Sequence, residues 1–459
     1  MEKTNKKLWQ WAISIILPLC ICLIPLSEVY TAELRIFFIV TLFAILLVAF
    51  DLVDSLIAAV VLFMGYYATG IVDAATVFSS WSNDVAWMII GSLVFAAALN
   101  QTGIMKRFAY TLILKLGGSY TKMLWAIYFV GVIISVLTSC NGFPLLAAIA
   151  FAICKGLGYP LGSKESNGIA LAAMAGSVCP FAWLYNPINA GVGDAVLKLI
   201  NPDLAITWVS YLQISWPWFV FDLLWMILLT KVFFKSTGAG VKTEFFKNEL
   251  GKLGQISSAE KKALVLTIII VLYMIIASFT GWKTAYGFSL IAWAVFLPGI
   301  NLANSDTIKS VNFGVVFFTV ACITIGSVGN ALGVGELINS LVGPMLENVS
   351  NVGFIGGVWG ISTAANFLLT PVACSTVLGV PLMQIGASLG VDPVATLFTI
   401  MMNTSNVFMP HENTAYLLFF AFGLMMMKDF IKYNAVRMVG HLIFMMAIIV
   451  PYWFLIGVL

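Results

Sequence analysis

The sequence has little charge and few of the residues that enzymes and metal sites use. Only 9% of its 459 residues are Asp, Glu, Lys or Arg, whereas a soluble domain carries about 25%. Hydrophobic residues make up 61% of the chain, and its mean hydropathy is +1.01. This composition excludes an ordinary soluble protein. It predicts an all-α polytopic membrane protein that lies in a lipid bilayer.

Candidates for metal binding and catalysis are scarce. The chain has two histidines, His411 and His441, and its seven cysteines lie in apolar segments without a Cys-x-x-Cys pattern. No HExxH motif is present. We therefore expect no metal site, no organic cofactor, no catalytic residues and no nucleic-acid partner.

Long apolar runs dominate the sequence instead. A helix needs about 20 mostly apolar residues to cross a bilayer. We expect eleven such spans, of which two are interrupted by an acid, Asp222 or Glu412. The expected spans are 8–27, 36–50 (extended to about 33), 55–72, 85–105, 166–193, 204–230, 263–282, 284–305, 310–330, 393–427 and 438–459.

Two further apolar runs, 123–154 and 348–391, are too long for a single crossing. Each contains small or polar residues near its middle, at Thr138–Pro144 and Thr370–Thr376. A straight helix of either length would overshoot a hydrocarbon core of about 30 Å. We predict that both runs are re-entrant hairpins, which enter and leave the membrane on the same side.

The positions of lysine and arginine support this topology. With the N-terminus in the cytoplasm, 20 of the 23 basic residues, including Arg437, are expected on the cytoplasmic side. The exceptions are Arg35, Lys198 and Lys283. This bias follows the positive-inside rule, and it requires that 123–154 be a hairpin. The C-terminus is then expected outside, and the chain in the plasma (inner) membrane.

The two halves of the chain resemble each other. We expect a first repeat at 1–234 and a second at 263–459, separated by a charged cytoplasmic linker at 235–262. After each hairpin comes a span broken by proline and polar residues, at 166–200 and at 393–427. Broken helices at matching positions of an inverted-topology repeat indicate the substrate site of a secondary transporter.

In such a repeat the hairpin tips and helix breaks converge near the middle of the membrane. Helix N-termini there favour anions, while unwound carbonyls and neutral side-chain oxygens suit Na⁺. No Lys or Arg lies in these segments, so a polyanion site built on bidentate arginine is not expected. The residues expected to bind substrate are Ser139, Asn141, Asn189, Thr370 and Asn413. Those expected to couple the ion are Ser139, Asn141, Asn186, Ser375, Asn403, Ser405, His411 and Glu412.

Glu412 has two interpretations. An ionisable residue at membrane depth is a functional candidate by default, so Glu412 could be a cation ligand or a proton acceptor, with His411 as its hydrogen-bond partner. Alternatively, its carboxylate caps the second half of the broken helix, where the helix dipole stabilises an acid.

Several motifs carry a family resemblance. They are Trp81-Ser-Asn83, Ala96–Gly103, Lys106-Arg107, Ser139-Cys-Asn141, Asn186-Pro-Ile-Asn189 and Asp392-Pro393. With these motifs the chain resembles the divalent anion/sodium symporter family over nearly its whole length. That family carries Ser-Asn-Thr at each hairpin tip, whereas the second tip here reads Thr370-Pro-Val-Ala373, and Glu412 adds a charge to the second break.

The resemblance implies Na⁺-coupled symport of a small, dicarboxylate-like anion. It also implies a homodimer in which the hairpins and broken helices move as an elevator against the remaining helices. The alternatives are a cation/proton antiporter and an H⁺-coupled anion permease, both of which would use Glu412.

Overall fold

The computed structural model describes residues 2–50, 52–116, 118–234, 243–346, 349–367, 369–403 and 406–459. These ranges are built from helices, turns and irregular segments and contain no extended strand. The expected all-α fold is therefore confirmed.

Within the described residues, seven helices are long and apolar enough to cross a bilayer. An eighth crossing is possible where α11 (Trp208–Ser215) meets α12 (Pro217–Leu228) and its π-helical end η4 (Leu229–Phe233) at a bend of 51°. The seven long helices are α2 (Ala32–Ala49), α5 (Asp84–Thr102), α7 (Tyr120–Thr138), α14 (Ser258–Thr280), α17 (Phe313–Ala331), α20 (Pro371–Ser388) and the continuous run of α23 (Met427–Phe444), η7 (Met445–Ile449) and α24 (Val450–Leu455).

Not every expected span is a long helix. Two of them form shorter apolar helical stretches, Leu8–Leu23 at the end of α1 (Glu2–Cys20) and α3 (Ser55–Thr69). The expected span 284–305 is not one helix, because α15 (Tyr286–Ser289) and η5 (Ile291–Phe296) are followed by irregular chain. There Pro298 lacks an N–H, and Gly299 and Asn301 have φ of +88° and +48°, so the helix cannot continue. The other short elements are η1 (Ile21–Leu23), α4 (Ala74–Phe78), η2 (Ser79–Ser82) and α16 (Ser305–Lys309).

The first expected hairpin segment folds as two helices. After α6 (Ile104–Leu116), the chain forms α7 and then α8 (Phe143–Leu157), with a turn at residues 139–142 between them. The broken helix that follows consists of α9 (Lys164–Ser177) and α10 (Asn189–Lys198), and the break contains the short η3 (Cys179–Ala182). Both interruptions lie where the sequence places polar residues and proline.

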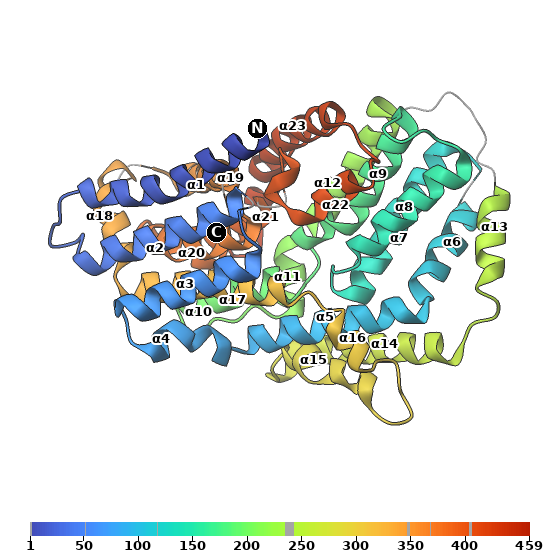
Figure 1. Cartoon of the computed structure of the whole chain (residues 1–459), viewed down its shortest axis with the longest axis horizontal. Coiled ribbons are helices and arrows are strands. Elements are labelled where there is room, and N and C mark those ends of the chain that lie inside the picture. Colours follow the sequence, from blue (N-terminus) through green and yellow to red (C-terminus); the bar gives the residue numbers. More distant parts are fainter. Residues whose placement is uncertain are drawn as a thin grey trace.

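The second half has the same order of elements. Here α18 (Val334–Leu346) precedes α19 (Asn351–Asn366) and α20, which meet at a turn before Pro371. The second broken helix comprises α21 (Pro393–Asn403) and α22 (Thr414–Ala421), with η6 (Pro410–Glu412) in the break. In Figure 1, α7 and α8 lie in the right half of the molecule and α20 in the left half, with α12, α21 and α22 between them.

Helices of the two halves pack directly on one another. A methyl group added at Gly379 of α20 would lie 2.7 Å from Val196 of α10, and one added at Gly193 of α10 would lie 2.6 Å from the sulfur of Met401. Small residues permit this close approach of helices. Between α8 and the residue that follows α22, the rings of Phe151 and Phe422 lie 5.2 Å apart.

Several contacts between distant segments join residues for which the sequence predicts the same side of the membrane. Residues expected on the cytoplasmic side contact each other, and so do residues expected outside. The first group of contacts joins Gln101 to Thr307, Arg107 to Glu260, and Lys262 to the carbonyl of Gly299. At the opposite end of α5 and α14, Lys283 pairs with Asp84 over 2.9 Å.

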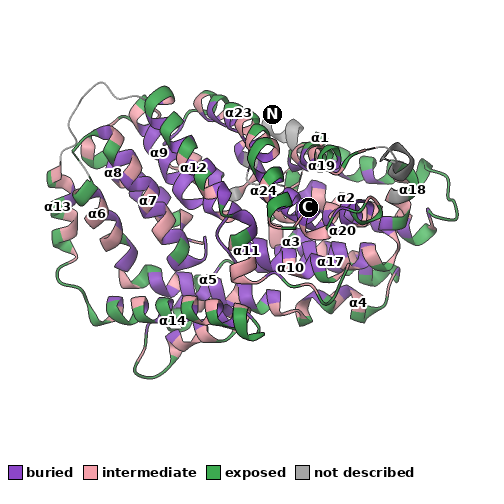
Figure 2. Cartoon of the chain, turned by 180° about the vertical axis from the view of Figure 1, so that it is seen from behind, coloured by how far each residue is buried: buried purple, intermediate pink, exposed green. Residues whose placement is uncertain are grey.

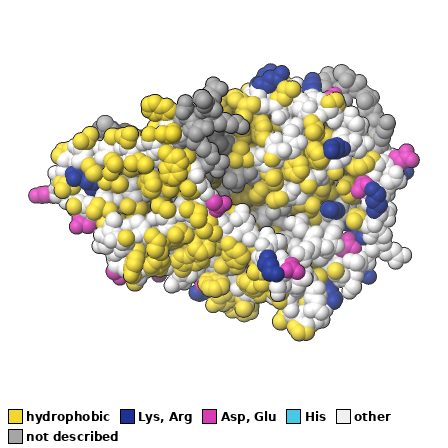
Figure 3. Space-filling model, viewed as in Figure 1, with side chains coloured by type: hydrophobic (Ala, Val, Ile, Leu, Met, Phe, Trp, Pro, Cys, Tyr) yellow, Lys and Arg dark blue, Asp and Glu magenta, His cyan; other side chains and the backbone are white. Residues whose placement is uncertain are grey.

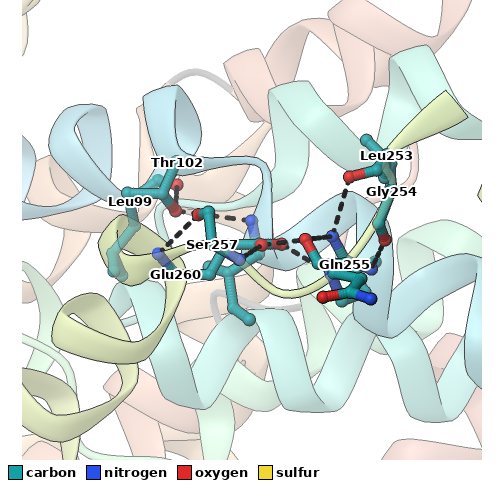
Figure 4. Close-up of polar contacts among 9 residues, drawn as sticks. Leu99, Thr102, Leu253, Gly254, Gln255, Ser257 and Glu260 are labelled. Carbon is teal, nitrogen blue, oxygen red and sulfur yellow. Dashed lines mark hydrogen bonds and ion pairs between the residues drawn. The ribbon is translucent and has the colours of Figure 1, made fainter.

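The described part of the expected linker is held against α6. The Arg107 guanidinium donates to the carbonyls of Leu253, Gly254 and Gln255 and to the Glu260 carboxylate, over 2.7–3.2 Å. Figure 4 shows these acceptors close together at the start of α14. In α13 (Thr243–Lys252), Phe246 is fully buried. The linker from residue 243 onward is therefore docked on the protein, while residues 235–242 lie outside the described part.

The outer surface suits a bilayer. Hydrophobic side chains cover much of the face shown in Figure 3, and α14 presents a largely exposed face in Figure 2. The exposed residues of α14 include Val265, Ile268, Ile269, Leu272 and Ile276. Apolar surface of this extent is unfavourable in water and stable in lipid.

Candidate functional site

A cavity of about 450 Å³ lies between the second hairpin tip and the helices α2, α3 and α17. Its lining is mainly aliphatic and aromatic, with polar contributions from Thr370 at the tip, Glu412 in the break, and Asp54 and Ser55 at the start of α3. This size and lining are typical of small-molecule sites. Two predicted site residues, Thr370 and Glu412, therefore face the same space.

Thr370 determines where α20 begins. Its side chain accepts a hydrogen bond from the Ala373 amide over 3.4 Å, and Pro371 occupies the first helical position. Threonine at the N-cap followed by proline is a favourable helix start, because proline has no N–H that needs a partner. The N-terminus of α20 is thereby fixed at the cavity wall.

The buried carboxylate of Glu412 stabilises the break itself. It accepts from the amides of Phe408 and Met409 over 2.5–3.3 Å, and from Nδ2 of Asn366 over 3.1 Å. The side chain that caps α22 is Asn413, which accepts from the Ala415 amide over 3.0 Å. Asn413 therefore supplies the side-chain cap of α22, and Glu412 lies directly before it. Glu412 closes the preceding loop and joins that loop to the end of α19.

Asn403, the last residue of α21, attaches the second break to α19. Its Nδ2 lies 2.7 Å from the Trp359 carbonyl and 2.8 Å and 2.7 Å from the hydroxyls of Ser362 and Thr363. Its Oδ1 accepts from Nδ2 of Asn406 over 3.0 Å. The amide thus has partners on both its nitrogen and its oxygen.

The first hairpin tip has a strained backbone. Ser139 and Cys140 have φ of +50° and +66°, a region that costs a non-glycine residue roughly 1–2 kcal/mol. Strain of this kind is common at binding sites. Asn141 donates from Nδ2 to the carbonyls of Thr138 and Ser139, and lies 3.5 Å from the Ser92 hydroxyl of α5. The tip is therefore held against α5.

Polar side chains also stabilise the first break. Asn186 Oδ1 accepts from the amide of Asn189, the first residue of α10, over 2.7 Å. Asn189 Nδ2 lies 3.4 Å from the Phe181 carbonyl, which also accepts from the Tyr211 hydroxyl over 2.8 Å. Both asparagines are buried, and together they define the start of α10.

The predicted residues fall into separate groups. Ser139, Asn141, Asn186 and Asn189 do not line the cavity that Thr370 and Glu412 share. Ser375 lies one turn inside α20, where its hydroxyl donates to the Pro371 carbonyl over 3.1 Å. Two predicted positions, Ser405 and the side chain of His411, lie outside the described part of the structure.

The sequence did not reveal the buried ion pair between Asp222 of α12 and Arg437 of α23. Their oxygen and nitrogen atoms lie 3.3 Å apart, and both side chains are about 5% exposed or less. Asp222 also accepts from Nε1 of Trp183 in the first break over 2.8 Å. Arg437 donates to Oδ1 of Asn406 in the second break over 3.1 Å.

This pair corrects one expectation. Arg437 was expected at the cytoplasmic surface, but it belongs to α23 and its side chain is buried in the protein. A guanidinium does contact a helix break, although the break segments themselves contain no arginine. The sequence feature that could have indicated this pair is one acid and one base, each in an otherwise apolar helix. Charges at membrane depth usually pair with each other.

Comparison with solved structures places this fold among membrane transporters. The YdaH transporter of Alcanivorax borkumensis matches with a TM-score of 0.56 and 16% identity, covering 99% of this chain and 98% of that one. MtrF of Neisseria gonorrhoeae, whose structure is reported as one that explains a class of antimetabolite efflux pumps, matches with a TM-score of 0.53 and 14% identity. That match covers 79% of this chain and 80% of the other.

No curated protein matches this sequence. The family described as the sodium:sulfate symporter transmembrane region matches residues 5–459. This confirms the resemblance to divalent anion/sodium symporters and assigns the chain to a family of transporters rather than enzymes. The chain belongs to the sodium:sulfate symporter family of integral membrane transporters.

Proposed function

We propose that this protein is a secondary active transporter that carries a small, dicarboxylate-like anion together with Na⁺. The observation that carries the proposal is that four helices, α8, α10, α20 and α22, begin at the hairpin tips and helix breaks. Their N-termini present positive dipole ends, which favour an anion. Ser139, Asn141, Asn189, Thr370 and Asn413 are the proposed substrate ligands.

The same regions offer ligands for a sodium ion. The helices α7, α9, α19 and α21 end at the tips and breaks and present backbone carbonyls there. Carbonyls and neutral side-chain oxygens are the ligands that hold Na⁺ in broken-helix transporters. The proposed ion-coupling residues are Ser139, Asn141, Asn186, Ser375, Asn403, Ser405, His411 and Glu412.

Two inverted repeats, at 1–234 and 263–459 on either side of the 235–262 linker, would give this protein its alternating access. In the proposed cycle the hairpins and broken helices move as an elevator within a homodimer. The N-terminus would be cytoplasmic and the C-terminus outside, in the plasma or inner membrane. The contacts of Arg107 with Glu260 and of Lys283 with Asp84 join residues that this topology assigns to the same side of the membrane.

A second candidate is a cation/proton antiporter or an H⁺-coupled anion permease that uses Glu412. The cavity favours it in one respect. The charged side chains among its described lining residues are the acids Asp54 and Glu412, with no Lys or Arg. A dianion beside two carboxylates would meet like-charge repulsion, whereas a proton or metal cation would not.

A thermal-shift screen tests the two candidates. Purified protein is heated with sulfate, succinate or citrate, each with and without Na⁺. Because a ligand that binds the folded state raises the Tm, symport predicts a larger shift with anion and Na⁺ together than with either alone. A shift with Na⁺ that no anion increases would favour the antiporter.

A further inference from the structure

The Asp222–Arg437 pair contacts both helix breaks at once. We propose that these two residues are positioning residues, which hold the breaks in a fixed relative arrangement so that binding at one break is transmitted to the other. This inference rests on the proposed function. Asp222 acts on the first break through Trp183, and Arg437 acts on the second through Asn406.

Each oxygen of the Asp222 carboxylate has its own partner. Oδ2 accepts from Trp183 Nε1 over 2.8 Å, and Oδ1 accepts from Arg437 Nη2 over 3.3 Å. Trp183 directly follows η3 in the first break, and its side chain is buried. A shift of this break would therefore displace the carboxylate relative to the guanidinium.

Arg437 fixes the orientation of an amide in the second break. A guanidinium can only donate hydrogen bonds, so the side chain of Asn406 must present Oδ1 to it. Nδ2 of Asn406 is then directed at Oδ1 of Asn403, 3.0 Å away. Nδ2 of Asn403 in turn reaches α19. Because the charged Arg437 can only donate, it determines which group donates and which accepts in every hydrogen bond of this series.

A second layer of contacts closes this network into a ring. His441, one turn beyond Arg437, stacks on Trp218, one turn before Asp222, with ring centroids 3.9 Å apart. Nδ1 of His441 accepts from Nε1 of Trp359 over 3.1 Å, and the Trp359 carbonyl accepts from Asn403. Thus α12, α23, α19 and the second break are connected in a closed circuit.

Packing alone does not account for the ion pair. Charges at membrane depth are costly, and replacing a buried ion pair with apolar residues is often neutral or stabilising. An apolar pair, however, could not orient the Asn406 amide or accept from Trp183. Orientation of the breaks is therefore the property that these charges supply.

Hydrogen exchange of the purified full-length protein tests this transmission without any substrate. Trp183→Phe removes one N–H donor from the first break and keeps an aromatic ring. We expect amide exchange to rise at least about tenfold, the effect of one lost hydrogen bond to a charged group, in both 178–188 and 406–413. Trp216→Phe is the matched control, because it removes a tryptophan donor that bonds Tyr452 near the surface. A rise confined to 178–188 would overturn the inference.

Transport kinetics in proteoliposomes provide the second test, with sulfate and succinate as probes. For Asp222→Leu/Arg437→Met, we expect the KM values for Na⁺ and anion to rise about tenfold, with a Tm near that of the wild type. Asp84→Asn/Lys283→Gln removes an exposed ion pair as a control. Wild-type KM values in the buried double variant would contradict the inference. If the wild type transports neither anion, the proposed function fails, and hydrogen exchange alone decides the positioning role.

Discussion

Nδ2 of Asn366 donates a hydrogen bond to Oε2 of Glu412 over 3.1 Å, and both side chains are buried. Asn366 is the last residue of α19, and Glu412 belongs to the break between α21 and α22. The second hairpin tip and the second break are thus joined at the wall of the cavity. A cation or proton that reached Glu412 would therefore act on both elements.

Glu412→Gln should change the Na⁺ or pH dependence of transport. Glutamine keeps an oxygen for the amides of Phe408 and Met409 but removes the negative charge that a cation or proton requires. The measurement is initial uptake rate as a function of Na⁺ concentration and of pH, with Asp84→Asn as an exposed-acid control. Unchanged profiles in both titrations would leave Glu412 with only its role in closing the loop.

At the first tip, Ser139→Ala and Asn141→Ala should weaken the apparent affinity for substrate or Na⁺ while expression stays normal. Ser139→Gly separates the hydroxyl from the backbone strain. It should lose the same affinity and gain about 1 kcal/mol of stability, because glycine adopts positive φ without a steric cost. Concentration-dependent uptake and thermal unfolding measure the two effects. Normal kinetics in all three variants would show that the tip is not part of the site.

The sequence predicted where helices are interrupted, but it did not predict which distant segments contact each other. Proline and polar residues in apolar runs indicated both tips and both breaks, because backbone polar groups in a membrane need local partners. Glu412 and Thr370 were identified for the same reason, and they line one cavity. Ser375 lies one turn inside α20 and not at the tip itself, because Thr370 and Pro371 determine where this helix begins.

The Asp222–Arg437 pair could not be found in the same way. The two residues are 215 positions apart, and Arg437 follows two lysines that fit a cytoplasmic segment. Sequence periodicity does not reveal which helices are neighbours. The irregular chain after Phe296 was missed for a different reason, since hydropathy responds to apolar residues and not to the positive φ of Gly299 and Asn301.

Gly91→Ala should destabilise the protein strongly. A methyl group at this position of α5 would lie 1.9 Å from the carbonyl oxygen of Phe288 in α15, so one of the two helices must move. Overpacking of this kind costs about 1–3 kcal/mol. The matched control is Gly360→Ala in α19, where no atom lies within 4 Å. There alanine should be neutral or stabilise by up to about 1 kcal/mol. Equal Tm values for the two variants would disagree with the packing of α5 on α15.

Arg107→Ala should release the linker from α6. The substitution removes the partner of the buried Glu260 carboxylate and three backbone contacts, at a cost on the order of 2 kcal/mol. Limited proteolysis should then cleave near residues 243–257 faster than in the wild type. Lys309→Ala, which breaks an exposed pair with Asp306, should change neither stability nor cleavage. An unchanged cleavage rate in Arg107→Ala would contradict the claim that Arg107 holds the linker on the protein.

Uptake into proteoliposomes under separate Na⁺ and H⁺ gradients tests the central claim most directly. Radiolabelled sulfate and succinate are supplied outside, and accumulation is followed under an inward Na⁺ gradient, an inward H⁺ gradient or neither. Na⁺-coupled symport predicts that the Na⁺ gradient concentrates an anion above its external level, while the H⁺ gradient alone does not. Anion entry that ignores both gradients would contradict the account, and a proton flux driven by Na⁺ without any anion would identify an antiporter instead.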